Sequence, residues 1–152
     1  MITAARMAQP SSHPADSASL RLTNRRDDIN GAEEALLAAL TRHGYGETSK
    51  FAVRLAVEEA LSNAFHHGHR SLPSGTPVRF EYAVSPAEVH VHIEDQGPGF
   101  TPADVPDPTA DENLELPSGR GLLLMRAYMT DVEFSGRGNV LHMRYQRPVG
   151  ES

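Results

Sequence analysis

Residues 58–68 read Glu-Glu-Ala-Leu-Ser-Asn-Ala-Phe-His-His-Gly and form the most informative stretch of the chain. At about 100° per residue, the spacing predicts a helix with Glu59 and Asn63 one turn apart on a polar arc, opposite an apolar one. A carboxylate beside a carboxamide suits proton abstraction together with metal coordination. A solvated face of an amphipathic helix has the same pattern, so this stretch alone leaves both interpretations open.

Two later segments combine glycine with polar residues. Residues 93–100 read Ile-Glu-Asp-Gln-Gly-Pro-Gly-Phe, which places an acid and two glycines directly after an alternating strand. Residues 118–125 read Ser-Gly-Arg-Gly-Leu-Leu-Leu-Met, which places two glycines at the start of an apolar helix. Glycine lets the backbone approach a ligand closely, so both segments are candidates for a binding site.

Composition narrows the classes of function. A chain of 152 residues, 39% of them hydrophobic, is expected to form one globular domain. The absence of cysteine excludes disulfides and thiolate zinc sites. The formal net charge of −6 disfavours nucleic acid as a direct partner, and no apolar run approaches the roughly 20 residues that span a bilayer. We therefore expect a cytoplasmic protein that contacts neither nucleic acid nor membrane.

Several common nucleotide-binding designs are also excluded. A P-loop requires lysine directly after glycine, but the single lysine, Lys50, lies between serine and phenylalanine. The chain contains no H-R-D or D-F-G triplet of ordinary protein kinases and no G-x-S-x-G hydrolase motif. Its glycine pairs do not extend to G-x-G-x-x-G, so a dinucleotide-binding fold is unsupported.

Periodicity predicts three helices and about five strands. Asn24 or Asp27 is expected to cap the first helix and Thr48 or Ser49 the second. The strands are expected near 18–23, 78–84, 89–93, 132–134 and 140–145, and the helices end near 43, 68 and 129. Hairpin-paired strands beside helices predict an α+β two-layer sandwich, with three helices on one face of a mixed, mostly antiparallel sheet.

The domain is expected to span residues 18–147, between a flexible N-terminal tail (1–17) and a short C-terminal tail (148–152). Within it, residues 101–118 contain four prolines, five acids and no lysine or arginine. A structureless stretch of this length inside a compact domain is usually functional.

An E-x-x-x-N helix, then D-x-G-x-G, then G-x-G-L before a helix, in this order, resembles the GHKL ATPase superfamily. The short format is similar to bacterial anti-sigma-factor serine/threonine kinases, and the resemblance covers roughly residues 18–147. It implies the Bergerat ATP-binding fold, a histidine kinase-like ATPase domain with ATP and Mg²⁺ held between helices and sheet under a mobile lid.

The resemblance assigns roles to three side chains. Glu59 matches the general base that takes a proton from a partner hydroxyl or from water, and Asn63 matches the Mg²⁺ ligand. Asp95 matches the carboxylate that reads the adenine amino group, which guanine replaces with a carbonyl. Without that resemblance, Glu59 can be explained as a surface carboxylate on a helix, and Asp95 can be explained as an ordinary turn residue.

Other positions are expected to contact the nucleotide. Free N–H groups at a helix start can receive phosphate oxygens, and an arginine there adds a charge-assisted contact. Two positions depart from the family: His66 stands where a basic residue is common, and Asn139 stands where many relatives have threonine. The remaining nucleotide-binding set is His66, His67, Gly97, Gly99, Gly119, Arg120, Gly121 and Leu122, of which Leu122 is more suited to the core.

The resemblance implies a regulatory kinase that phosphorylates an anti-anti-sigma (STAS) protein and holds a sigma factor inactive, usually as a homodimer. The alternative is a nucleotide-gated binding module of the same fold with little or no kinase turnover, which the departures at His66 and Asn139 favour. A metal site built from the histidines near residue 67 is disfavoured, because His66 and His67 diverge by about 100° on a helix.

Overall fold

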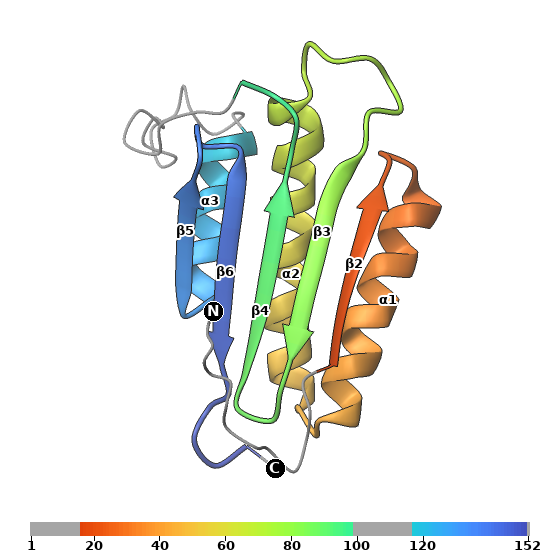
Figure 1. Ribbon diagram of the computed structural model, residues 1–152. Helices are drawn as coiled ribbons and strands as arrows, with labels where there is room; N and C mark the ends of the chain where they lie inside the picture. Colours follow the sequence, from red (N-terminus) through yellow and green to blue (C-terminus); the bar gives the residue numbers. More distant parts are fainter. Residues whose placement is uncertain (1–15, 99–116, 152) are drawn as a thin grey trace.

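The computed structural model describes residues 16–98 and 117–151, and these residues form two layers (Figure 1). Three helices cover one face of a five-stranded sheet, as predicted. The elements are β2 (Asp16–Leu22), α1 (Arg26–Arg42), α2 (Glu47–Asn63), the π-helical turn η1 (Ala64–Gly68), β3 (Val78–Val84), β4 (Glu88–Glu94), α3 (Pro117–Tyr128), β5 (Asp131–Ser135) and β6 (Val140–Gln146). None of the helices in these ranges is long and apolar enough to cross a membrane.

The described sheet has the strand order β2-β3-β4-β6-β5, and each of its four pairings is antiparallel. The described strands therefore contain none of the parallel pairs that a mixed sheet would have. One row of paired residues crosses all five strands: Ser19, Glu81, His92, His142 and Glu133. These side chains point to the sheet face without helices, because their neighbours along each strand point to the core.

The core lies between the sheet and the helices. Along β3 every second residue is buried, and Phe80 and Val84 are fully excluded from solvent. Leu36 of α1, Val57 of α2 and Met125 of α3 pack into the same cluster. Each buried side chain of this size contributes about 1.5–3 kcal/mol relative to exposure, so the strand alternation and helix periodicity together account for the layered arrangement.

The prediction that Asn24 or Asp27 caps α1 is wrong. A different carboxylate forms the local hydrogen bonds at the start of this helix. The N-cap residue is Arg25, with no side-chain cap. Asp28, in the first turn, instead accepts from the backbone N–H of Thr23 at 2.9 Å and from its hydroxyl at 2.7 Å. These two hydrogen bonds hold the connection between β2 and α1. Asn24 and Asp27 take no part in them, and both are exposed.

The expected cap of α2 is also wrong. The N-cap residue is Gly46, and Thr48 and Ser49 lie inside the helix. Ser49 is buried, and its hydroxyl lies 2.8 Å from the hydroxyl of Tyr145 on β6. A serine that resembles a cap in sequence thus joins the start of α2 to the sheet.

Two elements begin earlier in the structure than the sequence predicted. Residues 16 and 17, which were expected in the N-terminal tail, begin β2. Asp16 forms a 2.8 Å ion pair with Arg42 of α1. Pro117 and Ser118, expected in the acidic stretch, begin α3, consistent with the preference of proline for a first helical turn. The remainder of residues 101–118 lies outside the described residues.

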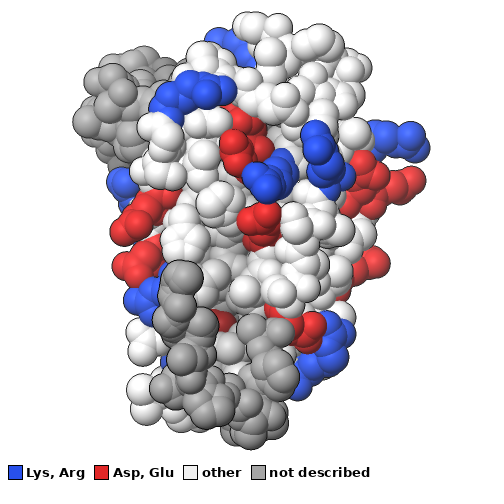
Figure 2. All heavy atoms as spheres, viewed as in Figure 1, with Lys and Arg blue, Asp and Glu red and all other residues white. Residues whose placement is uncertain are grey.

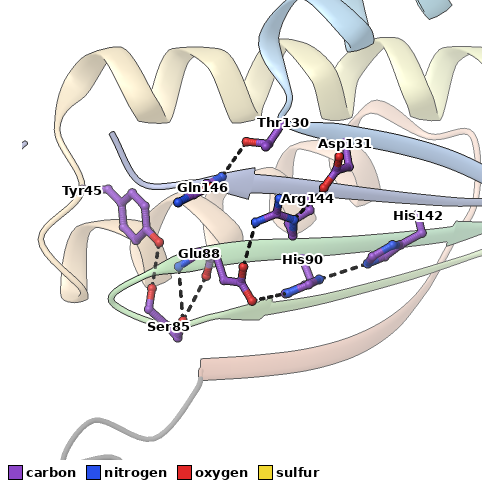
Figure 3. Close-up of polar contacts among 9 residues, drawn as sticks. All are labelled: Tyr45, Ser85, Glu88, His90, Thr130, Asp131, His142, Arg144 and Gln146. Carbon is purple, nitrogen blue, oxygen red and sulfur yellow. Dashed lines mark hydrogen bonds and ion pairs between the residues drawn. The ribbon is translucent and has the colours of Figure 1, made fainter. Parts of the chain in front are cut away.

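The sheet face without helices is polar, with acidic and basic side chains interspersed over it (Figure 2). On β4 and β6, Glu88 accepts from Arg144 at 3.1 Å and lies 2.8 Å from His90 (Figure 3). Arg144 also donates to Asp131 at 2.7 Å, and His90 lies 3.0 Å from His142. A chain of polar contacts therefore links three strands.

Candidate functional site

The three segments singled out in the sequence meet at one end of the molecule. Figure 1 shows the end of α2, the end of β4 and the start of α3 at the same edge. A methyl group added at Gly68 would collide with the carboxylate of Asp95, and one added at Gly97 would collide with the carbonyl oxygen of Gly68. The loop after β4 therefore lies directly against η1, and only glycine permits this approach.

The start of α3 contacts the end of α2. A methyl group added at Gly121 would lie 2.9 Å from Nδ2 of Asn63 and 3.1 Å from Oδ1. Gly121 is buried, so the two helices pack closely at this point. The structure therefore brings the three segments together, and Asn63, Asp95, Gly97 and Gly121 lie where they meet.

Asp95 immediately follows β4 and is held in place through its backbone. Its N–H donates to the carbonyl oxygen of Asn139 at 3.0 Å, and its Oδ1 accepts from the N–H of Gly97 at 2.8 Å. No described residue donates a hydrogen bond to Oδ2, which leaves this oxygen as an acceptor for a ligand. Burial raises the pKa of the Asp95 carboxyl group.

Three residues outside the predicted nucleotide-binding set hold the loop that carries Asp95. The buried Asn139 donates from Nδ2 to the carbonyl oxygen of Asp95 at 2.9 Å. Arg137 donates from Nε to the carbonyl oxygen of Gly97, and His69 accepts the N–H of Gln96 at Nε2, each at 2.9 Å. The sequence signal for Asn139 was its place in the family pattern. His69 stood out only as part of a histidine cluster, and nothing marked Arg137, because both residues contact backbone atoms far along the chain.

Asn63 and Glu59 lie one turn apart on α2, as predicted, so their side chains project to the same side. Oδ1 of Asn63 is buried and has no hydrogen-bond partner among the described residues. Mg²⁺ prefers oxygen ligands and uses few of them from the protein, so an unpartnered amide oxygen fits this ion. Glu59 is half-buried, and no hydrogen bond or ion pair joins it to another described residue, while Glu58 forms a 2.6 Å ion pair with Arg26.

The predicted histidines lie on η1, a π-helical turn that sequence periodicity did not indicate. Such turns often occur at functional sites because they reorient side chains at the end of a helix. Nδ1 of the exposed His66 lies 3.1 Å from the hydroxyl of Ser62. Nε2 of His67 is buried without a described partner. Burial, followed by the charges of Arg70 and His66, lowers the pKa of His67, so its imidazole is neutral at pH 7.

α3 begins before the two glycines that were expected to open it. The helix begins at Pro117, so Gly119 and Arg120 lie in its first turn, whose N–H groups have no partner within the helix. Gly121 lies one residue beyond them. Arg120 is exposed, whereas Leu122 is buried and belongs to the core, so a nucleotide contact from Leu122 is not supported. Gly99 lies outside the described residues.

The family described as histidine kinase-like ATPase domain matches residues 22–145. The chain belongs to this family. The match extends from the last residue of β2 almost to the end of β6 and contains every segment of the site. Membership in an ATPase domain family makes ATP the expected ligand.

Two relatives agree with this assignment. The chain is 24% identical over 130 residues to the serine-protein kinase RsbW of Oceanobacillus iheyensis, covering 82% of each protein. It is also similar to a crystal structure of RsbU and RsbW domains from Mycobacterium tuberculosis, with a TM-score of 0.60 and 14% identity over 88% of this chain. This chain spans only 33% of that longer structure, and the likeness shows the histidine kinase-like ATPase fold.

Proposed function

We propose that this protein is an ATP- and Mg²⁺-dependent serine/threonine kinase of the anti-sigma-factor type. It transfers the γ-phosphate of ATP to a hydroxyl group of a STAS-type anti-anti-sigma protein and binds a sigma factor. The observation that carries the proposal is the meeting of Asn63, Asp95 and Gly121 at the end of α2, where one oxygen of Asn63 and one of Asp95 accept no hydrogen bond from a described residue. A relative named as a serine-protein kinase supports the reaction class.

Adenine recognition is assigned to Asp95. Its Oδ1 is occupied by Gly97, so Oδ2 is the oxygen that would accept the amino group of adenine. Guanine presents a carbonyl oxygen at that place and would repel a carboxylate. Asn63 would hold Mg²⁺ through Oδ1, and the bound ion would offset the negative charge of the phosphates. The first-turn N–H groups of α3, together with Arg120, would bind phosphate oxygens.

Proton transfer is assigned to Glu59. As the partner hydroxyl oxygen forms its bond to the γ-phosphorus, its proton passes to the Glu59 carboxylate, and the bond from that phosphorus to the bridging oxygen of ADP breaks. The products are a phosphorylated side chain, ADP and a proton that Glu59 later releases to water. Positioning and charge stabilisation provide most of the rate enhancement in such reactions, and a base contributes roughly 10²–10⁴-fold.

The proposal is tested with labelled ATP and purified STAS proteins encoded beside the gene. Glu59→Gln should lower phosphate transfer by about 10²-fold or more while ATP binding changes less than about threefold. Glu58→Gln is the matched control, because it removes the neighbouring carboxylate, which is paired with Arg26. Transfer that is unaffected by Glu59→Gln would contradict the assignment of the base.

The alternative function is a nucleotide-gated binding module without turnover. It is favoured by Asn139, whose side chain holds the Asp95 loop, and by His66, which contacts Ser62. Binding of ATP and of a STAS protein, with no label transferred by the unaltered protein, would establish the module. Homodimer formation and a cytoplasmic location stay proposals, to be checked by analytical ultracentrifugation and by cell fractionation.

A further inference from the structure

The outer surface of the helix layer carries an exposed aromatic pair. Phe51 of α2 is 59% exposed and Tyr128 of α3 is 38% exposed. Their rings meet edge to face, with centroids 5.9 Å apart. Beside Phe51, a surface hollow of about 360 Å³ is lined by Leu37, Ala38, Thr41, Glu47, Lys50 and Arg54. Large exposed aromatic side chains next to a hollow are typical of protein-binding surfaces.

The aromatic pair lies on two stripes that run toward the proposed catalytic residue. On α2, Phe51, Leu55 and Glu59 are each four residues apart and share one stripe. On α3, Tyr128, Leu124 and Arg120 have the same spacing.

The two helices run in opposite directions (Figure 1), since Phe51 meets Tyr128 at one end and Asn63 meets Gly121 at the other. Each stripe therefore begins at the aromatic pair and ends near the site.

Charge distinguishes this surface from the rest of the protein. The whole chain has a formal net charge of −6, but α2 and α3 together contain four basic and three acidic residues. Glu47 pairs with Lys50 at 2.7 Å, Glu58 pairs with Arg26 at 2.6 Å, and Arg54 pairs with Glu33 of α1 at 3.7 Å. Within the described residues, no ion pair involves Arg120 or Arg126 of α3, and both are exposed. A partner that complements this surface is acidic around an apolar anchor.

We propose that the seam between α2 and α3 is the docking surface for the protein substrate, with Phe51 and Tyr128 as its apolar anchor. The proposal rests on the proposed kinase function. Phe51 and Glu59 are eight positions apart on α2, which places the anchor about 12 Å along the helix axis from the base. The substrate is therefore an acidic protein with an apolar surface residue at about that distance from its reactive hydroxyl. Docking there delivers the hydroxyl to Glu59 without using the adenine pocket.

The test separates substrate docking from chemistry. Phosphate transfer to a STAS protein encoded beside the gene is measured over a range of STAS concentrations for the unaltered protein and for Phe51→Ala and Tyr128→Ala. Each variant should raise KM for the protein substrate by about tenfold and leave kcat and ATP affinity unchanged, because an interface anchor contributes to binding alone. The matched control is Leu123→Ala, since Leu123 is 50% exposed on α3 but lies about 140° around the helix from Tyr128.

The outcomes distinguish this proposal from the proposed function. Transfer with an unchanged KM in Phe51→Ala overturns the docking surface and leaves the kinase in place. ATP-dependent STAS binding that Phe51→Ala weakens, without transfer, supports the surface and rejects the kinase. If no STAS protein binds or is phosphorylated, both are rejected. If sedimentation shows that Phe51→Ala dissociates a dimer of the unaltered protein, the occupant is a second copy and the proposal is overturned.

Discussion

Polar side chains are paired with one another on the sheet face without helices, whereas some at the end of α2 have no partner among the described residues. On the sheet, Glu88 contacts both Arg144 and His90, and Arg144 also reaches Asp131. At the end of α2, the buried Oδ1 of Asn63 and Nε2 of His67 have no partner among the described residues. An unpartnered buried polar atom costs about 1–3 kcal/mol. The cost is tolerated where a ligand supplies the missing partner, so the contrast points to the end of α2 as the ligand site.

Other buried polar atoms without hydrogen bonds sharpen this contrast. Glu33 has two such oxygens, but Arg54 lies 3.7 Å away. Arg147 and Glu151 each have one such atom, and they face each other at 3.5 Å. Glu33, Arg147 and Glu151 each lie within 4 Å of an ionisable side chain. The amide of Asn63 is neutral, and no described residue gives its Oδ1 a hydrogen bond, so a buried and unpartnered neutral oxygen marks the site better than burial alone.

The largest effect is expected where the loop after β4 touches η1. Gly97→Ala would place a methyl group against the carbonyl oxygen of Gly68, so backbone must move. We expect the free energy of unfolding to fall by about 3 kcal/mol and ATP binding to be lost, consistent with forced overpacking. Urea unfolding and isothermal titration calorimetry measure the two effects.

A glycine in open space provides the control for that change. Gly31 lies within α1, and a methyl group added there would meet no atom within 4 Å. Gly31→Ala should stabilise the protein by about 0.5–1 kcal/mol, because alanine loses less backbone freedom in a helix. Equal destabilisation by both substitutions would show that the contact between the loop and η1 is not what constrains Gly97.

The next largest effect concerns the nucleotide alone. Asp95→Asn replaces Oδ2, which accepts no hydrogen bond from a described residue, with a group that can donate, so ATP affinity should fall by about 30- to 100-fold, or roughly 2–3 kcal/mol. Asp131→Asn is the matched control on the sheet face, where Asp131 pairs with Arg144. Calorimetric titration of both variants with ATP decides the point. Equal ATP affinity in both variants would remove Asp95 from the adenine pocket.

Much of the fold was predictable because alternation and helical periodicity report burial directly. The alternation of β3 predicted its buried face, including Phe80, and the family pattern predicted the meeting of Asn63, Asp95 and Gly121. The caps failed for a physical reason. A serine or aspartate can cap a helix, but it can also bond elsewhere, as Ser49 does with Tyr145.

The supporting residues of the site could not be predicted from local pattern. Asn139 and His69 act through backbone atoms of residues 95 and 96, and these pairs are 44 and 27 positions apart in the chain. Such contacts depend on the strand order and on the π-helical turn, neither of which has a clear local signal. The groups that we propose contact the nucleotide were therefore accessible from the sequence, whereas the groups that hold their loop in place required the structure.

The pH dependence of stability tests how a buried carboxyl group behaves when it has no hydrogen bond, and Glu33 is such a group among the described residues. Burial, followed by the neighbouring carboxyl group of Glu58, raises the pKa of Glu33 to about 8 from an ordinary value of 4.5. The folded protein therefore holds a proton that the unfolded chain releases, and the free energy of unfolding falls as pH rises from about 4.5 through 8.

Glu33→Gln should remove this loss, so its stability relative to the unaltered protein rises by about 1–3 kcal/mol between pH 5 and pH 9. Urea denaturation at both pH values measures the change. Glu34→Gln, which removes an exposed carboxylate from the same helix, is the control. A constant difference between Glu33→Gln and the unaltered protein would mean that Glu33 is ionised in the folded state.

The smallest effect is expected on the sheet face, at His142. Burial, followed by the charges of His90 and His92, lowers the pKa of His142, which Glu133 and Asp131 oppose. The unfolded chain takes up a proton near the ordinary value of 6.5 while the folded protein resists it, so the free energy of unfolding falls as pH drops below 6.5.

His142→Gln should reduce that loss by about 1 kcal/mol or less, because the imidazole is partly exposed and polar partners surround it. An NMR titration of the His142 ring measures the pKa directly. A pKa at or above 6.5 would show that the carboxylates outweigh burial, and that the sheet face accepts added charge as readily as water does. A lower pKa would show that burial and the neighbouring imidazoles outweigh the two carboxylates.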